Sequence, residues 1–256
     1  MPSVKLPPLF LSGSVGVGGA NRPTDVKAVQ NRLQYVREQS VRQSIPLRRP
    51  DYAGMGSRGM TSRIADGACD EITVGWIKEF QSIFLRNPDG QISPGGHTSR
   101  FLSRWEPRPI SSKVVWTGRL GEAWLLMSPL LPEGSRCTSA YRSVDDQKRV
   151  IDNMFKDTYG SELKAKLGVA TYDAILASTD DKRYPRMVKE LRGLGQDVAT
   201  PGTSPHQFGK AIDIGGPKEI DDEQVRVARM VGTANNALFS GKILKERNGC
   251  VHVEIR

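Results

Sequence analysis

The last residues of the chain, CVHVEIR, alternate between apolar and polar side chains. Successive side chains of a β-strand point to opposite faces of its sheet, so this alternation predicts a half-buried strand. Val251, Val253 and Ile255 should face a core, and His252 should face the opposite side. The chain contains only three histidines. The position of one of them on a strand face therefore limits the folds that the chain can adopt and the chemistry that it can perform.

A second alternating segment, KAIDI, lies within SPHQFGKAIDIGG. Ile212 and Ile214 should face a core, while Asp213 faces the opposite side. Gly209 lets the chain turn between His206 and this strand. Each predicted strand therefore directs one potential metal ligand away from the core.

His206, Asp213 and His252 together form a candidate zinc site. Catalytic zinc is bound by histidine nitrogens and carboxylate oxygens, with water in the remaining position. The metal activates that water and polarises a carbonyl, which is the chemistry that amide hydrolysis requires. A single histidine or strand aspartate is more often structural, so this prediction depends on the combination.

The first part of the chain is dominated by helical periodicity. Apolar residues recur at helical spacing in 22–39, 70–85 and 98–105, which predicts a small three-helix domain. A segment at about 42–69, rich in Arg, Gly and Ser, has no such period and predicts a basic surface loop. Two prolines among polar residues in 106–113 indicate a linker.

The sequence therefore predicts two domains, 1–108 and 113–256. In the second, helical spacing at 120–127, 144–155 and 227–231 is mixed with short strands, without regular βαβ alternation. This mixture favours an α+β fold: a small antiparallel sheet with flanking helices that carries the zinc site. The residues between the second of these helices and SPHQFGK form a long polar stretch.

The formal charge of +9 and the pI near 9.6 predict an anionic partner. Nucleic acid, a lipid surface and an acidic polymer such as bacterial cell wall all have this property. The basic residues are dispersed and no nucleic-acid motif accompanies them, so we expect no nucleic-acid binding. The N-terminal apolar run is brief and broken by prolines, which predicts neither a signal peptide nor a membrane span.

The three cysteines, Cys69, Cys137 and Cys250, are widely spaced and form no zinc-finger pattern or disulfide framework. If Arg142 faces the side of the sheet that carries His252 and Cys250, strand alternation turns Cys137 away from that side. We therefore expect no disulfide between these two residues.

SPHQFGKAID resembles the S-x-H-x-x-G-x-A-x-D motif of the zinc D-Ala-D-Ala peptidase superfamily, which includes vancomycin-resistance dipeptidases and carboxypeptidases, L-Ala-D-Glu endolysins and Hedgehog-type domains. SAYRS with Gln147 resembles that family's S-G-Y-R-S-x-x-x-Q element, and VHVE its terminal W-H-x-E or H-x-H strand. These elements occur in the family's order over about 113–256. The resemblance implies that His206, Asp213 and His252 bind zinc.

The same resemblance implies residues that contact substrate. Arg142 would bind a substrate carbonyl or carboxylate, for which its planar, always charged group is suited. Gln147 and Ser204 would contact substrate or hold the strand and loop in place.

The general base of the family has no direct counterpart in this chain. Many relatives have Glu or Asp three residues before the last zinc histidine, and others have a histidine two residues before it; here these positions are Gly249 and Cys250. Glu254, on the predicted strand face of His252, and Glu246, across a predicted turn, are the candidate bases. Glu254 also fits a structural role, and Cys250 fits either a fourth ligand or a nearby thiol.

Three segments of the first domain resemble, in order, the pieces of the three-helix peptidoglycan-binding domain. They are GANRPTDVKAVQNRL, DEITVGWIKEFQ and PDGQISPGGHTSRFL, within about 14–103. Gln30 and Gln81 fit both helix-cap and groove roles, and His97 is not expected to bind metal.

Both resemblances imply the same polymer, so the sequence predicts a zinc metallopeptidase that cleaves an amide bond in the stem peptide or cross-link of peptidoglycan. Carboxypeptidase and endopeptidase activity both fit. We expect a monomer that is made in the cytoplasm and acts in the periplasm or at the cell wall, delivered as a phage endolysin or as an injected antibacterial effector. An injected effector would require an immunity protein in its producer. The alternative is a non-catalytic, zinc-containing wall-binding protein that has lost its base.

Overall fold

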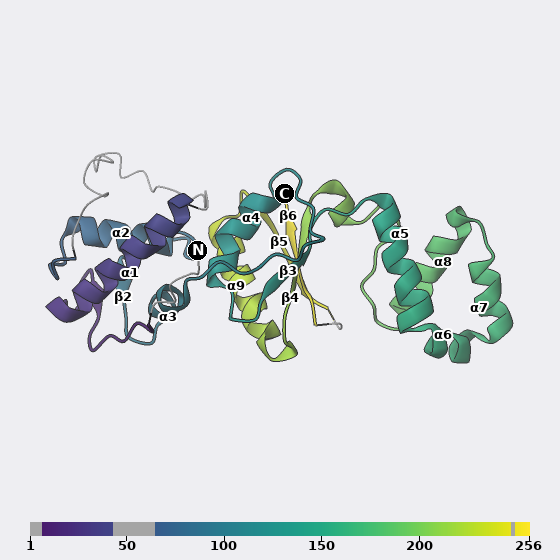
Figure 1. The fold of residues 1–256 in the computed structure, drawn as a ribbon, viewed down its shortest axis with the longest axis horizontal. Helices are drawn as coiled ribbons and strands as arrows, with labels where there is room; N and C mark the ends of the chain where they lie inside the picture. The colour runs from purple at the N-terminus through teal and green to yellow at the C-terminus, as the bar shows by residue number, and fades with distance from the viewer. Residues whose placement is uncertain (1–6, 43–64, 247–248) are drawn as a thin grey trace. The chain divides into compact units, whose positions relative to one another are not determined.

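The computed structural model describes residues 7–42, 65–246 and 249–256. The predicted basic loop falls almost entirely outside these residues. The backbone forms two compact units (Figure 1). Unit 1 contains Met1–Arg108, Glu122–Gly134 and Arg226–Gly241, and unit 2 contains Pro109–Gly121, Ser135–Val225 and Lys242–Arg256. Residues 1–108 thus share one unit with two later segments, and the domain boundaries at 108 and 113 stay a prediction.

Unit 1 contains the three helices expected from the N-terminal periodicity. They are α1 (Pro23–Arg42), α2 (Glu71–Gln81) and α3 (His97–Arg104), accompanied by a two-stranded antiparallel sheet of β1 (Val15–Gly16) and β2 (Gln91–Ile92). Asp70 caps α2 by accepting a hydrogen bond from the Thr73 backbone N–H, and Trp76, Ile77 and Phe80 are buried. The apolar stripes predicted from helical spacing therefore form the core of this unit.

Gln81 holds the turn that precedes β2. Its Oε1 accepts the Gly90 backbone N–H at 2.8 Å, and its Nε2 donates to Asp89 Oδ1 at 2.6 Å and to the Gln91 carbonyl at 2.8 Å. Gly90 has φ of +73°, a conformation that glycine adopts at little cost. Gln81 is thus a buried amide whose donor and acceptor are both used by one turn.

Gln30 holds a second turn in the same way. Its Oε1 accepts the Gly67 backbone N–H at 3.0 Å, and its Nε2 donates to Asp66 Oδ1 and to the Ala68 carbonyl, each at 3.0 Å. Each turn therefore consists of an Asp-Gly pair and a carbonyl acceptor around one glutamine. The structure assigns both glutamines to turn stabilisation, a choice that the sequence left open.

A four-stranded sheet with strand order β3–β4–β6–β5 belongs to unit 2, except for the start of β5 at residues 239–241, which is counted in unit 1. The strands are β3 (Arg136–Ser139), β4 (Ala211–Gly215), β5 (Phe239–Lys245) and β6 (Val251–Ile255), of which β3–β4 and β4–β6 pair antiparallel. Ile212, Ile214, Val251 and Val253 are fully buried, and Ile255 nearly so. The predicted α+β fold and the predicted core faces of β4 and β6 are confirmed.

The other secondary-structure elements after residue 108 in the described ranges are helices. They are α4 (Leu120–Met127), η1 (Ser128–Leu130), α5 (Val144–Asn153), the π-helical turn η2 (Met154–Thr158), α6 (Gly160–Leu167), α7 (Val169–Leu176), α8 (Asp180–Gly193), η3 (Pro205–Phe208), η4 (Lys218–Ile220) and α9 (Asp221–Ala234). Within the described ranges, none of the helices is both long and apolar enough to cross a lipid bilayer.

Sequence periodicity identified no helix in the long polar stretch after α5. Helices α6, α7 and α8 occupy most of it, and with α5 they form a separate group (Figure 1). Phe155, Leu163, Ile175 and Met187 are buried together in its core. These apolar residues are sparse among many charged ones, so only their packing against one another, and not a continuous stripe, marks these helices.

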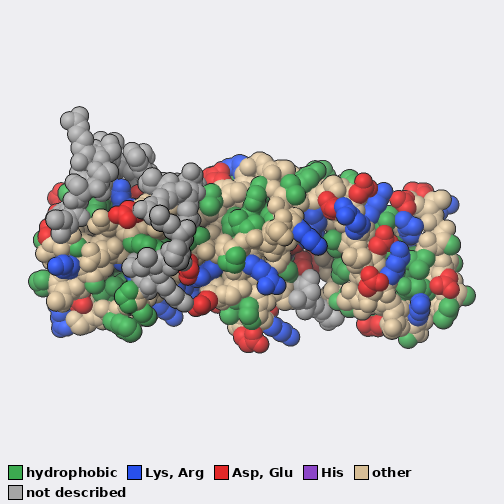
Figure 2. Space-filling view, viewed as in Figure 1, with side chains coloured by type: hydrophobic (Ala, Val, Ile, Leu, Met, Phe, Trp, Pro, Cys, Tyr) green, Lys and Arg blue, Asp and Glu red, His purple; other side chains and the backbone are tan. Residues whose placement is uncertain are grey.

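Charged side chains of both signs are interspersed over the face of the molecule shown in Figure 2. Lys and Arg lie among Asp and Glu there and form no continuous basic surface. A dispersed positive charge attracts a polyanion over long range without specifying its chemistry.

Candidate metal centre

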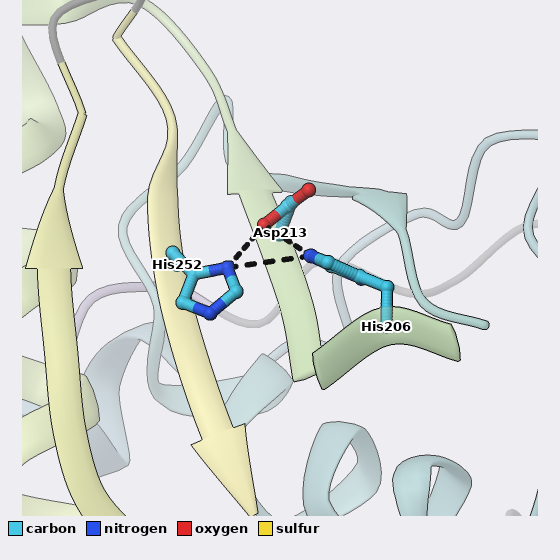
Figure 3. Close-up of side chains that lie close together, drawn as sticks. All are labelled: His206, Asp213 and His252. Carbon is cyan, nitrogen blue, oxygen red and sulfur yellow. Dashed lines mark hydrogen bonds and ion pairs between the residues drawn. The ribbon is translucent and has the colours of Figure 1, made fainter. Parts of the chain in front are cut away.

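Three buried side chains converge at one point of unit 2 (Figure 3). Asp213 Oδ1 lies 3.1 Å from His206 Nε2 and 3.0 Å from His252 Nδ1, and the two nitrogens are 3.3 Å apart. Tetrahedral zinc with bonds of about 2.0–2.1 Å separates its ligand atoms by about 3.3–3.4 Å. The spacing of these atoms therefore resembles one face of a zinc coordination shell.

The backbone determines this convergence. Asp213 on β4 and His252 on β6 are directly paired residues, so their side chains leave neighbouring strands on the same face. His206 lies in η3, which ends at Gly209 in the left-handed conformation, and this turn returns the chain into β4. A β-strand pair and one tight turn thus position all three ligand atoms.

The hydrogen bonds of His206 indicate that a cation belongs among these atoms. Its Nδ1 lies 2.6 Å from the Ala140 carbonyl, which only accepts, so Nδ1 carries the proton. In a neutral ring Nε2 then presents a lone pair. That lone pair faces Asp213 Oδ1, which is also an acceptor when ionised. Two acceptors at this distance suit a shared metal ion, so the residues fit zinc.

Glu254 supports the ring of His252 from the other side. Its Oε1 lies 3.4 Å from His252 Nε2 and accepts a hydrogen bond from Lys242 Nζ at 2.7 Å. Metal-binding histidines commonly donate their second N–H to a carboxylate, which fixes the ring orientation. This contact gives Glu254 the geometry of a positioning residue for His252.

Arg142 contacts the remaining oxygen of Asp213. Its terminal nitrogen pairs with Asp213 Oδ2, and its Nε donates to Ser139 Oγ at 2.7 Å. Burial opposes ionisation of Asp213, but its contacts with His206 and His252 and the charge of Arg142 hold its pKa below the ordinary value. Asp213 is therefore an ionised carboxylate with both oxygens in use.

A cavity of about 430 Å³ opens beside the three ligand atoms. Residues of the sheet and residues of α5, α8 and the segment after α8 line it. Both candidate bases, Glu246 and Glu254, are among them, as are Arg142, Gln147 and Ser204. The structure thus brings every predicted site residue to one cavity.

Glu246 lies just after β5, where the chain turns into β6. Its backbone N–H donates to the Cys250 carbonyl at 2.8 Å, and the Gly249 N–H donates to the Glu246 carbonyl at 3.2 Å. Gly249 has φ of +79°, which this turn requires. The half-buried Glu246 lies beside the cavity, six residues before His252 in the sequence.

Cys250 lies outside the group of metal-ligand atoms among the described residues. Its Sγ is 3.6 Å from Thr138 Oγ1, and burial raises its pKa to about 11, so it is a neutral thiol near neutral pH. Cys137 is fully buried on the other side of the sheet, and both cysteines are free. The expectation of no disulfide between them is confirmed.

Ser204 and Gln147 stabilise the loops around the site. The buried Ser204 donates its backbone N–H to Gln207 Oε1 at 3.2 Å, which holds the start of η3. Gln147 Nε2 donates to the Ala199 carbonyl at 2.9 Å. Two participants were not predicted from the sequence: the Ala140 carbonyl, since every residue has one, and Lys242, a common surface residue type.

Residues 134–240 match the family model of VanY, described as D-alanyl-D-alanine carboxypeptidase. This segment is a VanY-type domain. The match includes His206 and Asp213 and ends before His252. Searches of curated proteins and of solved structures found no match.

The VanY match confirms the predicted resemblance of the second half to the zinc D-Ala-D-Ala peptidase superfamily. It implies a carboxypeptidase-type hydrolase that acts on peptidoglycan. The resemblance of residues 14–103 to a peptidoglycan-binding domain lies outside the matched segment and stays a prediction.

Proposed function

We propose that this protein is a zinc-dependent peptidase that cleaves an amide bond in the stem peptide or cross-link of peptidoglycan. The observation that carries the proposal is the convergence of His206 Nε2, Asp213 Oδ1 and His252 Nδ1 beside a cavity in a VanY-type domain. The Ala140 carbonyl directs the His206 lone pair inward, which supports a bound cation.

His206, Asp213 and His252 would hold the zinc ion. When bound, zinc supplies Lewis-acid chemistry, activating a water and polarising the scissile carbonyl. Arg142, fixed by Ser139 and Asp213, directs its remaining N–H groups to a substrate carbonyl or carboxylate oxygen.

We assign the general base to Glu246. Glu254 faces His252 Nε2 and accepts from Lys242, which gives it a positioning role, and Glu246 is the other candidate base that lines the cavity, at the turn between β5 and β6. A carboxylate oxygen of Glu246 takes the proton of the attacking water and returns it to the leaving amide nitrogen. The carbon–nitrogen bond breaks as the water oxygen bonds to the carbonyl carbon.

The remaining parts of the proposal concern binding and delivery. The N-terminal helices would bind the wall, and the positive charge of the chain would favour approach to an anionic polymer. The protein would act in the periplasm or at the wall after phage-type release or injection, and injection would require an immunity protein in the producer.

Digestion of purified peptidoglycan tests the proposal. We expect new amino and carboxyl termini in released peptides by mass spectrometry, their loss with a chelator, and their return with added zinc. Absence of new termini at every pH tested would refute the proposed peptidase activity. Zinc-dependent wall binding without cleavage would support the non-catalytic alternative, which the lack of an acid at Gly249 favours.

A further inference from the structure

One wall of the cavity contains polar groups that the proposed hydrolysis does not use. This wall is formed by α5, by the end of α8 and by the segment 196–199. Gln147 and Arg192 project from the two helices and line the same cavity as His206. Within the described residues, neither side chain has hydrogen-bond partners for all of its polar atoms.

Arg192 is held in place but keeps its charge unpaired. Its Nε donates to the Val198 carbonyl at 3.0 Å, which orients the guanidinium. No acidic side chain pairs with Arg192 within the ranges that the structure describes. Its terminal N–H groups remain available, and their planar fork matches the two oxygens of a carboxylate.

Gln147 offers an acceptor beside this charge. It is 2% exposed, and its Nε2 is bonded to the Ala199 carbonyl. Its Oε1 is buried without a hydrogen-bond partner in the described part of the chain. Buried acceptors are nearly always paired, so an unpaired one that lines a cavity indicates a ligand N–H.

The two groups lie close together along the same segment. Arg192 binds the carbonyl of Val198, and Gln147 binds that of the next residue, Ala199. Consecutive residues are about 3.8 Å apart along the chain. A ligand that reaches both groups therefore carries an anion and an N–H donor on neighbouring parts of one molecule.

We propose that this wall, here called the Arg192 wall (Gln147, Arg192 and residues 196–199), binds a free carboxylate with a neighbouring N–H donor on the stem peptide. Arg192 binds the carboxylate, and Gln147 Oε1 accepts the N–H. The proposal rests on the proposed function for the identity of the polymer. Such a group occurs at a peptide C-terminus and at the end of a diamino-acid side chain that keeps its own carboxylate. Asp197 lines the same cavity and favours an ammonium as the N–H donor.

Binding of synthetic stem peptides to the metal-free protein tests the wall without relying on catalysis. Four peptides are compared by calorimetry: both carboxylates free, the C-terminal carboxylate amidated, the side-chain carboxylate amidated, and both amidated. We expect amidation of the recognised carboxylate to weaken binding about 10- to 100-fold, the range for a lost charged hydrogen bond. Amidation of the other carboxylate should leave binding nearly unchanged, which identifies the source.

Arg192→Ala should weaken binding of the free-carboxylate peptide by the same factor and have no further effect on the amidated one. Arg186→Ala is the matched control, since Arg186 is an exposed arginine of the same helix that does not line the cavity. Gln147→Met should also weaken binding, and far-ultraviolet circular dichroism checks that each variant folds. Equal binding of all four peptides by the wild type, or equal losses for free and amidated peptides in Arg192→Ala, would overturn the wall.

Peptide cleavage by the zinc-loaded protein separates this inference from the proposed function. Cleavage of all four peptides at equal kcat/KM would refute the proposed role of the Arg192 wall and leave the proposed peptidase activity intact. Selective binding without any cleavage would support the wall and refute the peptidase.

Discussion

Buried polar groups in the two units are satisfied in different ways. In unit 1, Gln81 uses its donor and its acceptor on one turn, with contacts of 2.6–2.8 Å to Asp89, Gly90 and Gln91. In unit 2, His206 Nε2 and Asp213 Oδ1 bring two acceptors together at 3.1 Å. Completed hydrogen bonding identifies a structural role, whereas converging acceptors identify a place for a cation.

The hydrogen bonding of Gln147 is only partly complete, which places it between the fully bonded Gln81 and the converging acceptors of the metal centre. Like Gln30 and Gln81 it is a buried amide that holds a backbone carbonyl, but its Oε1 lacks the glycine N–H that both of the others bind. The three glutamines cannot be distinguished by residue type. The number of satisfied atoms distinguishes a turn-stabilising glutamine from one that is available to substrate.

Substitution of a metal ligand should have the largest effect. His206→Ala, Asp213→Ala or His252→Ala should each abolish stoichiometric zinc and lower peptidoglycan cleavage by about 1,000-fold or more, because an incomplete site neither holds nor orients the metal. Metal analysis and peptide release measure this. Asp222→Ala, at an exposed position of α9, is the control and should keep full zinc. Full zinc in His252→Ala would refute the assignment.

Substitutions of the two glutamates at the cavity should affect different properties, turnover in one case and zinc affinity in the other. Glu246→Gln should keep zinc and lower kcat by about 100- to 10,000-fold, as expected for a general base. Glu254→Gln should weaken zinc affinity by about 10- to 100-fold, because it removes the carboxylate that orients His252. Zinc titration and single-turnover cleavage measure the two effects. Unchanged turnover in Glu246→Gln would return the base assignment to Glu254.

Loss of a satisfied amide should affect stability and leave zinc unchanged. Gln81→Ala and Gln30→Ala should each lower the free energy of unfolding by about 2–4 kcal/mol, because each leaves the buried glycine N–H of its turn unpaired and removes the amide donor to the turn carbonyl. Urea unfolding of the full chain measures this. Gln34→Ala on α1 is the control, since Gln34 donates a hydrogen bond to the exposed Glu38. A loss in Gln81→Ala no larger than in the control would contradict the turn role.

Cys137 offers a further comparison, because it is a buried group that is kept neutral, with its thiol donating to the Ser139 carbonyl at 3.6 Å. Burial raises its pKa to about 12. A group with a raised folded pKa contributes stability that is present below its unfolded pKa, near 9, and lost as pH rises toward 12. Over this window Cys137→Ala should reduce the fall of unfolding free energy with pH by at most about 1.4 kcal/mol per pH unit. Identical slopes in the two proteins would show that Cys137 titrates normally.

The sequence by itself determined the features that local geometry controls. Alternation in CVHVEIR and KAIDI reports a two-residue period that every strand imposes, so the core faces of β4 and β6 were predictable. Helical spacing identified α1 and α2 for the same reason. The order of His206, Asp213 and His252 among motif residues indicated a metallopeptidase before any distance was known.

Only the tertiary structure decided which atoms meet. The strand register places Asp213 directly opposite His252, and the Ala140 carbonyl determines which nitrogen of His206 carries the proton. In both cases the two residues are far apart in the sequence. Helices α6–α8 were missed because their apolar residues are recognisable as a core only after they pack. Local periodicity follows from covalent geometry, whereas distances between remote side chains follow from packing, which a single sequence does not display.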